Sequence, residues 1–290
     1  MNQHKPVDEV TGTATTGHEW DGIRELNTPL PRWWLWTFYA TVAFSLVYWV
    51  LMPSWPGITG YFHGILGYST RARIEVTMAD AARSMAGTRR SIASTPLADI
   101  EKNQALLEFA IAGGRSAFAV NCSQCHGGDA AGRPGFPNLN DDDWLWGGKL
   151  DDIYFTIKHG VRNGADPDAR TMDMPRFLAD GLLKSDQISD VADYVLSLSG
   201  TAHDADAAVR GQAVFAQNCA ACHGEHGEGN PQSGAPRLND QIWLYGGDKT
   251  TLIKTISYSR GGVMPNWGAR LDDETIKELA VYVHSLGGGK

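Results

Sequence analysis

All four cysteines of this 290-residue sequence belong to two Cys-x-x-Cys-His motifs, at residues 122–126 and 219–223. In such a motif the two thiols can form thioethers with the vinyl groups of a heme, and the histidine that follows can bind the iron. A zinc site would need further Cys and His pairs at zinc spacing, which the sequence lacks. The motifs therefore predict two covalently bound heme c groups. The predicted attachment sites are Cys122, Cys125, Cys219 and Cys222, and the predicted proximal iron ligands are His126 and His223.

The sequence around the first motif is repeated around the second. Phe118 and Phe215 each follow a glycine by four residues and precede a motif by four. A Pro-x-Leu-Asn stretch, a Trp-Leu-aromatic-Gly-Gly stretch and a Met-Pro pair follow each motif in the same order. Each copy ends with apolar residues spaced as on one face of a helix. The repeat predicts an all-α fold with two tandem domains, at residues 113–200 and 207–290.

The repeated unit resembles the class I cytochrome c fold. In that family an N-terminal helix with a Gly…aromatic pair crosses the C-terminal helix at an aromatic residue. The resemblance implies that Phe118 packs against Tyr194 in the first domain and that Phe215 packs against Tyr282 in the second. The loops between these helices would hold each heme in an apolar crevice. We expect the aromatic side chains of the repeated Trp-Leu stretch to wall the crevices, namely Trp144, Trp146, Trp243 and Tyr245.

In the same family the second axial ligand is a methionine that precedes a proline, and a Met ligand raises the heme potential. Met264 is the one methionine of the second domain, and it precedes a proline. In the first domain Met174 precedes a proline and is the preferred ligand, while Met172 and His159 are alternatives. With Met174 on the first iron and Met264 on the second, both irons are six-coordinate. Such hemes have no open site for a substrate, which favours electron transfer over catalysis.

The proximal histidines also need a partner for their second ring nitrogen. A hydrogen bond from Nδ1 to a backbone carbonyl fixes the tautomer of an iron-bound histidine. Pro137 and Pro236 occupy the same place in the two repeats, shortly after each motif. We expect their carbonyls to accept these two hydrogen bonds.

Residues 33–52 contain no charged side chain and are long enough to cross a membrane. As a helix, twenty residues span roughly 30 Å, the thickness of the hydrocarbon core of a bilayer. Aromatic residues gather at both ends, as in the aromatic belts of membrane helices. A polar stretch precedes the segment and no small-x-small site follows it, which disfavours a cleaved signal peptide. Because heme c is attached outside the cytoplasm, we expect an uncleaved transmembrane anchor between a cytoplasmic tail at residues 1–32 and a periplasmic segment at residues 53–112.

Two further segments carry weaker signals. Residues 53–112 include helical patterns at 74–90 and 97–110, and the apolar positions of the second pattern predict that it packs against another surface and is no flexible linker. Residues 162–170 are rich in glycine, proline and charge and have no counterpart in the second domain, so we expect a surface loop. This loop is either a docking site for a partner or a tolerated insertion.

Taken as a whole, the chain resembles one family, the diheme subunit (CcoP or FixP) of cbb3-type cytochrome c oxidases. The resemblance begins with residues 17–23 (GHEWDGI) and 30–34 (LPRWW), includes residues 48–56 (YWVLMPSWP), and continues through both heme domains. The N-terminal stretches are more specific than the heme motifs, which many unrelated cytochromes share.

This resemblance implies an electron-transfer subunit that is no enzyme by itself but belongs to a proton-translocating oxidoreductase. Electrons from a donor cytochrome c would pass through both hemes to a monoheme cytochrome c subunit. They would then reach the catalytic heme–copper subunit, where oxygen is reduced to water in low-oxygen respiration. The chain would lie in a bacterial inner membrane with both heme domains in the periplasm. Two alternatives are a free-standing membrane-anchored electron shuttle and the cytochrome subunit of a periplasmic dehydrogenase.

The charge of the chain disfavours one class of partner. The sequence has 25 basic and 33 acidic residues, which gives a net charge of −8. Nucleic-acid-binding domains carry basic patches, so this balance argues against nucleic acid as a partner. An acidic chain is compatible with the steering of a basic donor cytochrome.

Overall fold

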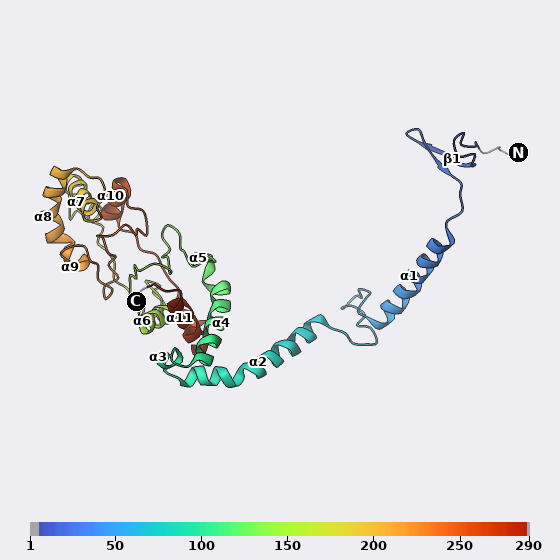
Figure 1. Cartoon of the computed structure of the whole chain (residues 1–290), viewed down its shortest axis with the longest axis horizontal. Helices are drawn as coiled ribbons and strands as arrows, with labels where there is room; N and C mark the ends of the chain where they lie inside the picture. The colour runs from blue at the N-terminus through green and yellow to red at the C-terminus, as the bar shows by residue number, and fades with distance from the viewer. Residues whose placement is uncertain (1–5, 289–290) are drawn as a thin grey trace. The chain divides into compact units, whose positions relative to one another are not determined.

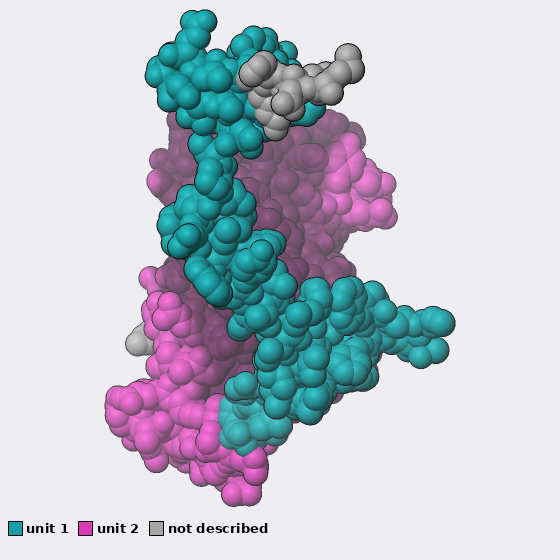
Figure 2. All heavy atoms as spheres, turned by 90° about the vertical axis from the view of Figure 1, so that its right-hand side faces the viewer, with its two compact units in different colours: residues 1–82 teal, residues 83–290 magenta. Residues whose placement is uncertain are grey.

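The computed structural model describes residues 6–288 and is mostly helical, as predicted. The chain divides into two compact units, Met1–Ala82 and Arg83–Lys290, which Figure 2 shows in teal and magenta. The first unit contains a β-hairpin and the apolar helix. The second contains both Cys-x-x-Cys-His motifs.

A small β-hairpin in the first unit is an element that the all-α prediction missed. Strand β1 (Thr15–Trp20) pairs in antiparallel fashion with β2 (Ile23–Leu26). Asp21 and Gly22 form the two-residue turn with φ angles of +53° and +83°. A tight hairpin turn of this kind needs positive φ at both central residues, which is why Asp-Gly is favoured there. The hairpin gives a physical reason for the Trp-Asp-Gly-Ile sequence that the family resemblance singled out.

Helix α1 (Arg32–Leu51) confirms the predicted apolar helix to within one residue. It is long and apolar enough to cross a membrane, and none of its residues is buried within the chain. Hydroxyl side chains along it donate to backbone carbonyls of the preceding turn, for example Thr37 to Trp33 at 3.0 Å. The hydroxyls of Thr37, Thr41 and Ser45 are therefore satisfied within the helix, as a hydrocarbon environment requires.

Polar side chains cap the starts of several helices in the second unit. Asn103, Asp204 and Asp272 each accept hydrogen bonds from backbone N–H groups in the first turn of the helix that follows. Helix α2 (Thr70–Ser94) leads into this unit and agrees with the predicted helix at 74–90. The helices that follow are α3 (Leu97–Ile100), α4 (Gln104–Asn121), α5 (Ser123–His126), α6 (Leu150–His159), α7 (Ser185–Leu198), α8 (Ala205–Asn218), α9 (Ala220–His223), α10 (Lys249–Tyr258), the 3₁₀ helix η1 (Trp267–Ala269) and α11 (Asp273–Ser285).

The long helices of the two repeats pair across the repeats and not within them. Helix α4 packs against α11, and α7 packs against α8, as Figure 1 shows. The rings of Phe118 and Tyr282 lie 5.5 Å apart, and those of Tyr194 and Phe215 lie 5.1 Å apart. The predicted pairs, Phe118 with Tyr194 and Phe215 with Tyr282, are therefore wrong, although the kind of contact is the one expected.

Two glycines allow the close approach at these crossings. A Cβ at Gly114 would overlap with the carbonyl of Glu278, and a Cβ at Gly211 would overlap with the carbonyl of Asp190. This exchange of helix partners between the two repeats follows from the connectivity of the chain. Residues 199–204 are the whole connection between α7 and α8, and helices joined by a short loop tend to pack as neighbours. The last helix of the first repeat therefore meets the first helix of the second.

The exchange produces two structural halves that differ from the sequence repeats. The first half comprises residues 83–171 and 261–288, and its core joins α4 and α6 to α11. The second half comprises the continuous residues 172–260, and its core joins α7 and α8 to α10. The names first half and second half are used below for these two sets of residues.

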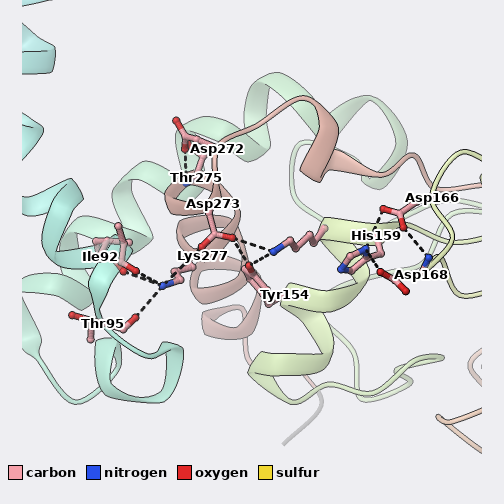
Figure 3. A network of polar contacts seen from close by, with 12 residues as sticks. Ile92, Thr95, Tyr154, His159, Asp166, Asp168, Asp272, Asp273, Thr275 and Lys277 are labelled. Atoms are coloured by element: carbon pink, nitrogen blue, oxygen red, sulfur yellow. Dashed lines mark hydrogen bonds and ion pairs between the residues drawn. The ribbon is translucent and has the colours of Figure 1, made fainter.

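Helix α11 is held at its start by the end of α2 and by α6. Lys277 donates to the carbonyls of Ile92 and Thr95 at 3.3 and 3.1 Å, and Tyr154 donates to Asp273, as Figure 3 shows. Ile92 is fully buried in the core of the first half. The buried side chains of Leu97 and Ile100 on α3, together with the core contacts of α4, confirm the prediction that this segment packs against another surface, which is the core of the first half.

The crossing of α4 and α11 contains a buried carboxyl group without a hydrogen-bond partner on one oxygen. Glu278 is 4% exposed, and its Oε1 is buried and unpaired. In the second half the equivalent residue, Asp190, is held by Arg210 through two hydrogen bonds of 2.7 and 2.8 Å. The residue of α4 that corresponds to Arg210 is Gly113, so Glu278 has no such partner. Burial raises the pKa of Glu278 from 4.5 to about 7.

This raised pKa predicts that Glu278→Gln stabilises the chain at high pH only. A carboxyl group whose pKa is higher in the folded state lowers the stability progressively as pH rises from the unfolded pKa to the folded pKa. The gain in unfolding free energy should reach about 3 kcal/mol at pH 8 and fall below about 1 kcal/mol at pH 5. Chemical denaturation of the heme-loaded chain at the two pH values measures it. An equal gain at both would show that the gain does not come from ionisation of Glu278.

Candidate heme sites

Each Cys-x-x-Cys-His motif forms a single helical turn directly after a long helix. Helix α4 ends at Asn121, and α5 begins at Ser123 with Cys122 as its cap. Residues at positions i, i+3 and i+4 lie on one side of a helix. The turn therefore presents Cys122, Cys125 and His126 on one side, and α9 does the same for the second motif.

The first crevice is lined by the first motif together with a methionine from the second repeat. Its lining includes Cys122, Cys125 and His126 together with Met264. Apolar side chains of α4, α6 and α11 also line it, namely Phe118, Ile153, Ile157, Leu279 and Val283.

The second crevice is lined by the same types of residue, and its methionine comes from the first repeat. It is lined by Cys219, Cys222 and His223, and by Met174 from the first repeat. Its apolar lining includes Phe177, Val191, Val195, Phe215, Leu252 and Ile256. The prediction that Met174 faces the first motif and Met264 the second is therefore wrong in its pairing. The cause is again the crossing of the chain between the halves, since each Met loop stays with the helix that follows it.

Both histidines are oriented as expected by a proline carbonyl. Nδ1 of His126 lies 3.0 Å from the carbonyl oxygen of Pro137, and Nδ1 of His223 lies 2.9 Å from that of Pro236. Burial lowers the pKa of both imidazoles, which favours the neutral form. With Nδ1 engaged as a donor, Nε2 keeps the lone pair that can bind a metal.

The structure also separates the three alternatives for the distal ligand of the first repeat. Met172 lines the second crevice but is 53% exposed. Met174 lines the same crevice and packs against the core of the second half. His159 is in neither lining among the described residues, and its Nδ1 lies 3.1 Å from Asp166 instead. The geometry therefore favours Met174.

The aromatic walls agree with the sequence analysis, with an addition to each crevice. Trp144 and Trp146 line the first crevice, and Trp243 and Tyr245 line the second. Trp267, on η1 beside the Met264 loop, also lines the first crevice. Its counterpart in the first repeat is Phe177, three residues after Met174, which lines the second crevice. The sequence analysis missed both residues, although an aromatic residue three positions after the methionine of each Met-Pro pair was a usable signal.

The donor set of each crevice fits a covalently bound heme c. Two thiols, a neutral imidazole and a thioether line each apolar cavity. Burial raises the pKa of Cys122 and Cys219 to about 11, so these thiols stay protonated near neutral pH. No second pair of cysteines or histidines at zinc spacing is present in the sequence. This combination of fold and site is that of a c-type cytochrome.

Comparisons with known families cover most of the chain. A family model for the N-terminal domain of cytochrome oxidase-cbb3, FixP, matches residues 12–59. The model for cytochrome c matches residues 111–199, and the model for cytochrome C oxidase, cbb3-type, subunit III matches residues 206–283. The ranges matched by these last two models coincide with the sequence repeats and not with the structural halves.

Curated relatives match from end to end. A cbb3-type cytochrome c oxidase subunit FixP from Azorhizobium caulinodans is 53% identical over the whole chain and 98% of its own length. FixP from Bradyrhizobium diazoefficiens is 52% identical, with both chains covered completely. CcoP from Cereibacter sphaeroides is 51% identical, with 99% of each chain covered. The chain belongs to the FixP/CcoP family of cbb3-type cytochrome c oxidase subunits.

Proposed function

We propose that each crevice holds one heme c and that the chain carries two. Cys122 and Cys125 would form the thioethers of the first heme, and Cys219 and Cys222 those of the second. The axial ligands would be His126 with Met264, and His223 with Met174. A heme held in this way supplies reversible one-electron chemistry at its iron. The observation that supports this assignment is the repeated set of two thiols, one imidazole and one thioether around each apolar crevice.

The residues of the chain hold and insulate these groups. The proline carbonyls fix the orientation of the histidines, and the apolar walls exclude water. A low local polarity and a thioether ligand both favour the reduced state and raise the potential. A site with two protein ligands leaves no position for a substrate. The chain is then an electron-transfer subunit and no enzyme by itself.

We further propose that the chain passes electrons to the oxidase named in its relatives. A donor cytochrome c would reduce one heme, and electrons would leave towards a monoheme cytochrome c subunit and the catalytic heme–copper subunit. Helix α1 would anchor the chain in the inner membrane, with residues 1–32 in the cytoplasm and the heme sites in the periplasm, where heme c is attached. The full-length identity of about half to FixP and CcoP proteins supports this role.

A single purification tests the role. The chain is extracted from its native membrane in mild detergent through an affinity tag, and the sample is analysed for heme type, copper and oxygen uptake. We expect two hemes c per chain, with heme b and copper co-purifying, and oxygen uptake driven by reduced cytochrome c. Removal of residues 1–53 and their replacement by a cleavable export signal should leave two hemes c and abolish co-purification.

Other results would change the assignment in defined ways. A diheme chain without heme b, copper or oxygen uptake would contradict the oxidase role and identify an electron shuttle. Co-purification with a flavin- or quinone-containing dehydrogenase would identify the subunit of a different complex. Fewer than two hemes per chain would contradict the assignment of the crevices.

A further inference from the structure

One arginine lies where the two crevices meet. Three residues line both crevices among those that the structure describes, and they are Leu145, Arg162 and Leu244. Arg162 is the charged member of this set. It begins the insertion that the second repeat lacks, and the sequence alone assigned it only to a surface loop. Its side chain is 21% exposed.

The guanidinium of Arg162 bonds to equivalent points of the two methionine loops. Its Nε donates to the carbonyl of Gly262 at 3.0 Å, and its Nη1 donates to the carbonyl of Met172 at 2.9 Å. Gly262 lies two residues before Met264, and Met172 lies two residues before Met174. A single side chain is thus tied to the same position of both repeats. The planar fork of arginine can hold two acceptors in this fixed geometry, which the single ammonium of lysine cannot reproduce.

The backbone beside Arg162 strengthens the connection to the first crevice. Val161 and Met264 exchange two backbone hydrogen bonds, at 3.0 and 2.9 Å. Arg162 itself has φ of +50°, a conformation that is uncommon for a residue with a side chain and that is retained where the surroundings enforce it. Its N–H donates to the carbonyl of Arg170 at 2.7 Å, which closes the inserted loop.

Arg162 is additional to a pair of arginines that the repeats share. Arg170 lies over the ring of Trp146 at 5.3 Å, and Arg260 lies over the ring of Tyr245 at 4.4 Å. Each donates from Nε to a threonine hydroxyl of the preceding helix at 3.0 Å. These two arginines are therefore equivalents. The insertion supplies Arg162 without a counterpart, so one copy serves both crevices.

We propose that Arg162 is a positioning residue shared by both heme sites, which holds the two methionine loops and raises the reduction potential of both hemes. This inference depends on the proposed heme sites. Arginine carries its charge throughout the physiological pH range. A fixed positive charge near an iron disfavours the additional positive charge of the oxidised state. Asp173 lies 3.5 Å away but is 67% exposed, so solvent screens its opposing charge.

Redox titration of the heme-loaded full chain tests this proposal with Arg162→Gln and Arg162→Lys. Heme content is measured first in the same samples, because loss of heme would concern the sites themselves. We expect Arg162→Gln to lower the midpoint potential of each heme by up to about 59 mV. For a one-electron couple, this shift changes the reduced-to-oxidised ratio about tenfold at a fixed potential. Arg162→Lys keeps the charge and should restore much of both shifts. Arg260→Gln is the matched control, because Arg260 lines the second crevice alone and should shift one midpoint.

The red absorption band of methionine-ligated ferric heme gives a second readout. Weakening of this band at both sites in Arg162→Gln would support the positioning role even if one midpoint could not be resolved. Two attached hemes with a change at one site only, or at neither, would overturn the proposal while leaving the heme assignment intact. If Arg162→Gln does not accumulate, Arg162→Lys is measured by the methionine bands alone, since the loss of the fork should weaken both bands while the charge is kept.

Discussion

Replacement of Met264 by leucine is expected to change the heme attached to Cys122 and Cys125, and to leave the heme attached to Cys219 and Cys222 nearly as it is. Leucine has the volume of methionine but no sulfur, so the iron of the affected heme would lose its proposed axial ligand. The potential of that heme should fall by on the order of 100 mV or more, within the span of roughly 0.8 V that axial ligands cover. The freed position should also bind carbon monoxide.

The reciprocal variant should act on the other heme. Met174 lines the crevice of Cys219, Cys222 and His223, so Met174→Leu is expected to lower the potential of the second heme. Met172→Leu serves as the matched control, because its side chain is half exposed in the same loop. We expect it to leave both potentials close to those of the native chain.

Assignment of each change to one heme needs a background in which one heme is absent. Cys219→Ala with Cys222→Ala leaves the first attachment site alone, and the heme count of the purified chain verifies this. In that background Met264→Leu should open the remaining heme to carbon monoxide, whereas Met174→Leu should not. The opposite result would show that each methionine serves the motif of its own repeat, and it would contradict the pairing of helices across the repeats. A response to both variants would show that the two loops compete for one iron.

Local chemistry explains why the sequence was informative about each site. The spacing of Cys122, Cys125 and His126 is a property of one helical turn, and it holds whichever helices lie around that turn. The hydrogen bonds to Pro137 and Pro236 connect residues separated by a short loop, so they were predicted correctly.

Long-range pairing was beyond the same reasoning because the two repeats present nearly equivalent helix faces. Phe118 and Phe215 follow a glycine at the same spacing, and either could accept the face of α7 or α11. The short connection between α7 and α8 indicated that these two helices pack together. The prediction followed the family resemblance instead. Arg162 was missed for a different reason. Its partners are backbone carbonyls, which leave no trace in the types of the neighbouring side chains.

The exchanged arrangement also predicts which piece of the chain can stand alone. Residues 172–260 contain all helices of the second half, with both thiols, the histidine and Met174 of its crevice. Exported to the periplasm by a cleavable signal, this piece should attach one heme and show the methionine band. Its potential should lie close to that of the second heme in the full chain, apart from the loss of Arg162.

Residues 207–290, which follow the sequence repeat, are the comparison of similar length. They retain the second motif but lack α7 and with it the buried side chains of Ile188, Val191 and Val195. Each such side chain contributes roughly 1.5–3 kcal/mol when buried. Together this is a large part of the 5–15 kcal/mol that stabilises a typical domain. We therefore expect this piece to be much less stable than residues 172–260, even where α11 replaces α7 in part.

Thermal unfolding and the methionine band of the two purified pieces decide between the arrangements. A stable, methionine-ligated piece from residues 172–260 requires that α7 and Met174 belong to the second heme. If residues 207–290 were the more stable piece and kept their methionine band at the native potential, the crossing of the chain would be wrong. The pieces differ in which helix faces Phe215, Tyr194 of α7 or Tyr282 of α11, so the comparison tests the pairing directly. In the full chain α7 has the advantage, because residues 199–204 keep it beside α8 throughout folding, whereas α11 must close a much longer loop to compete.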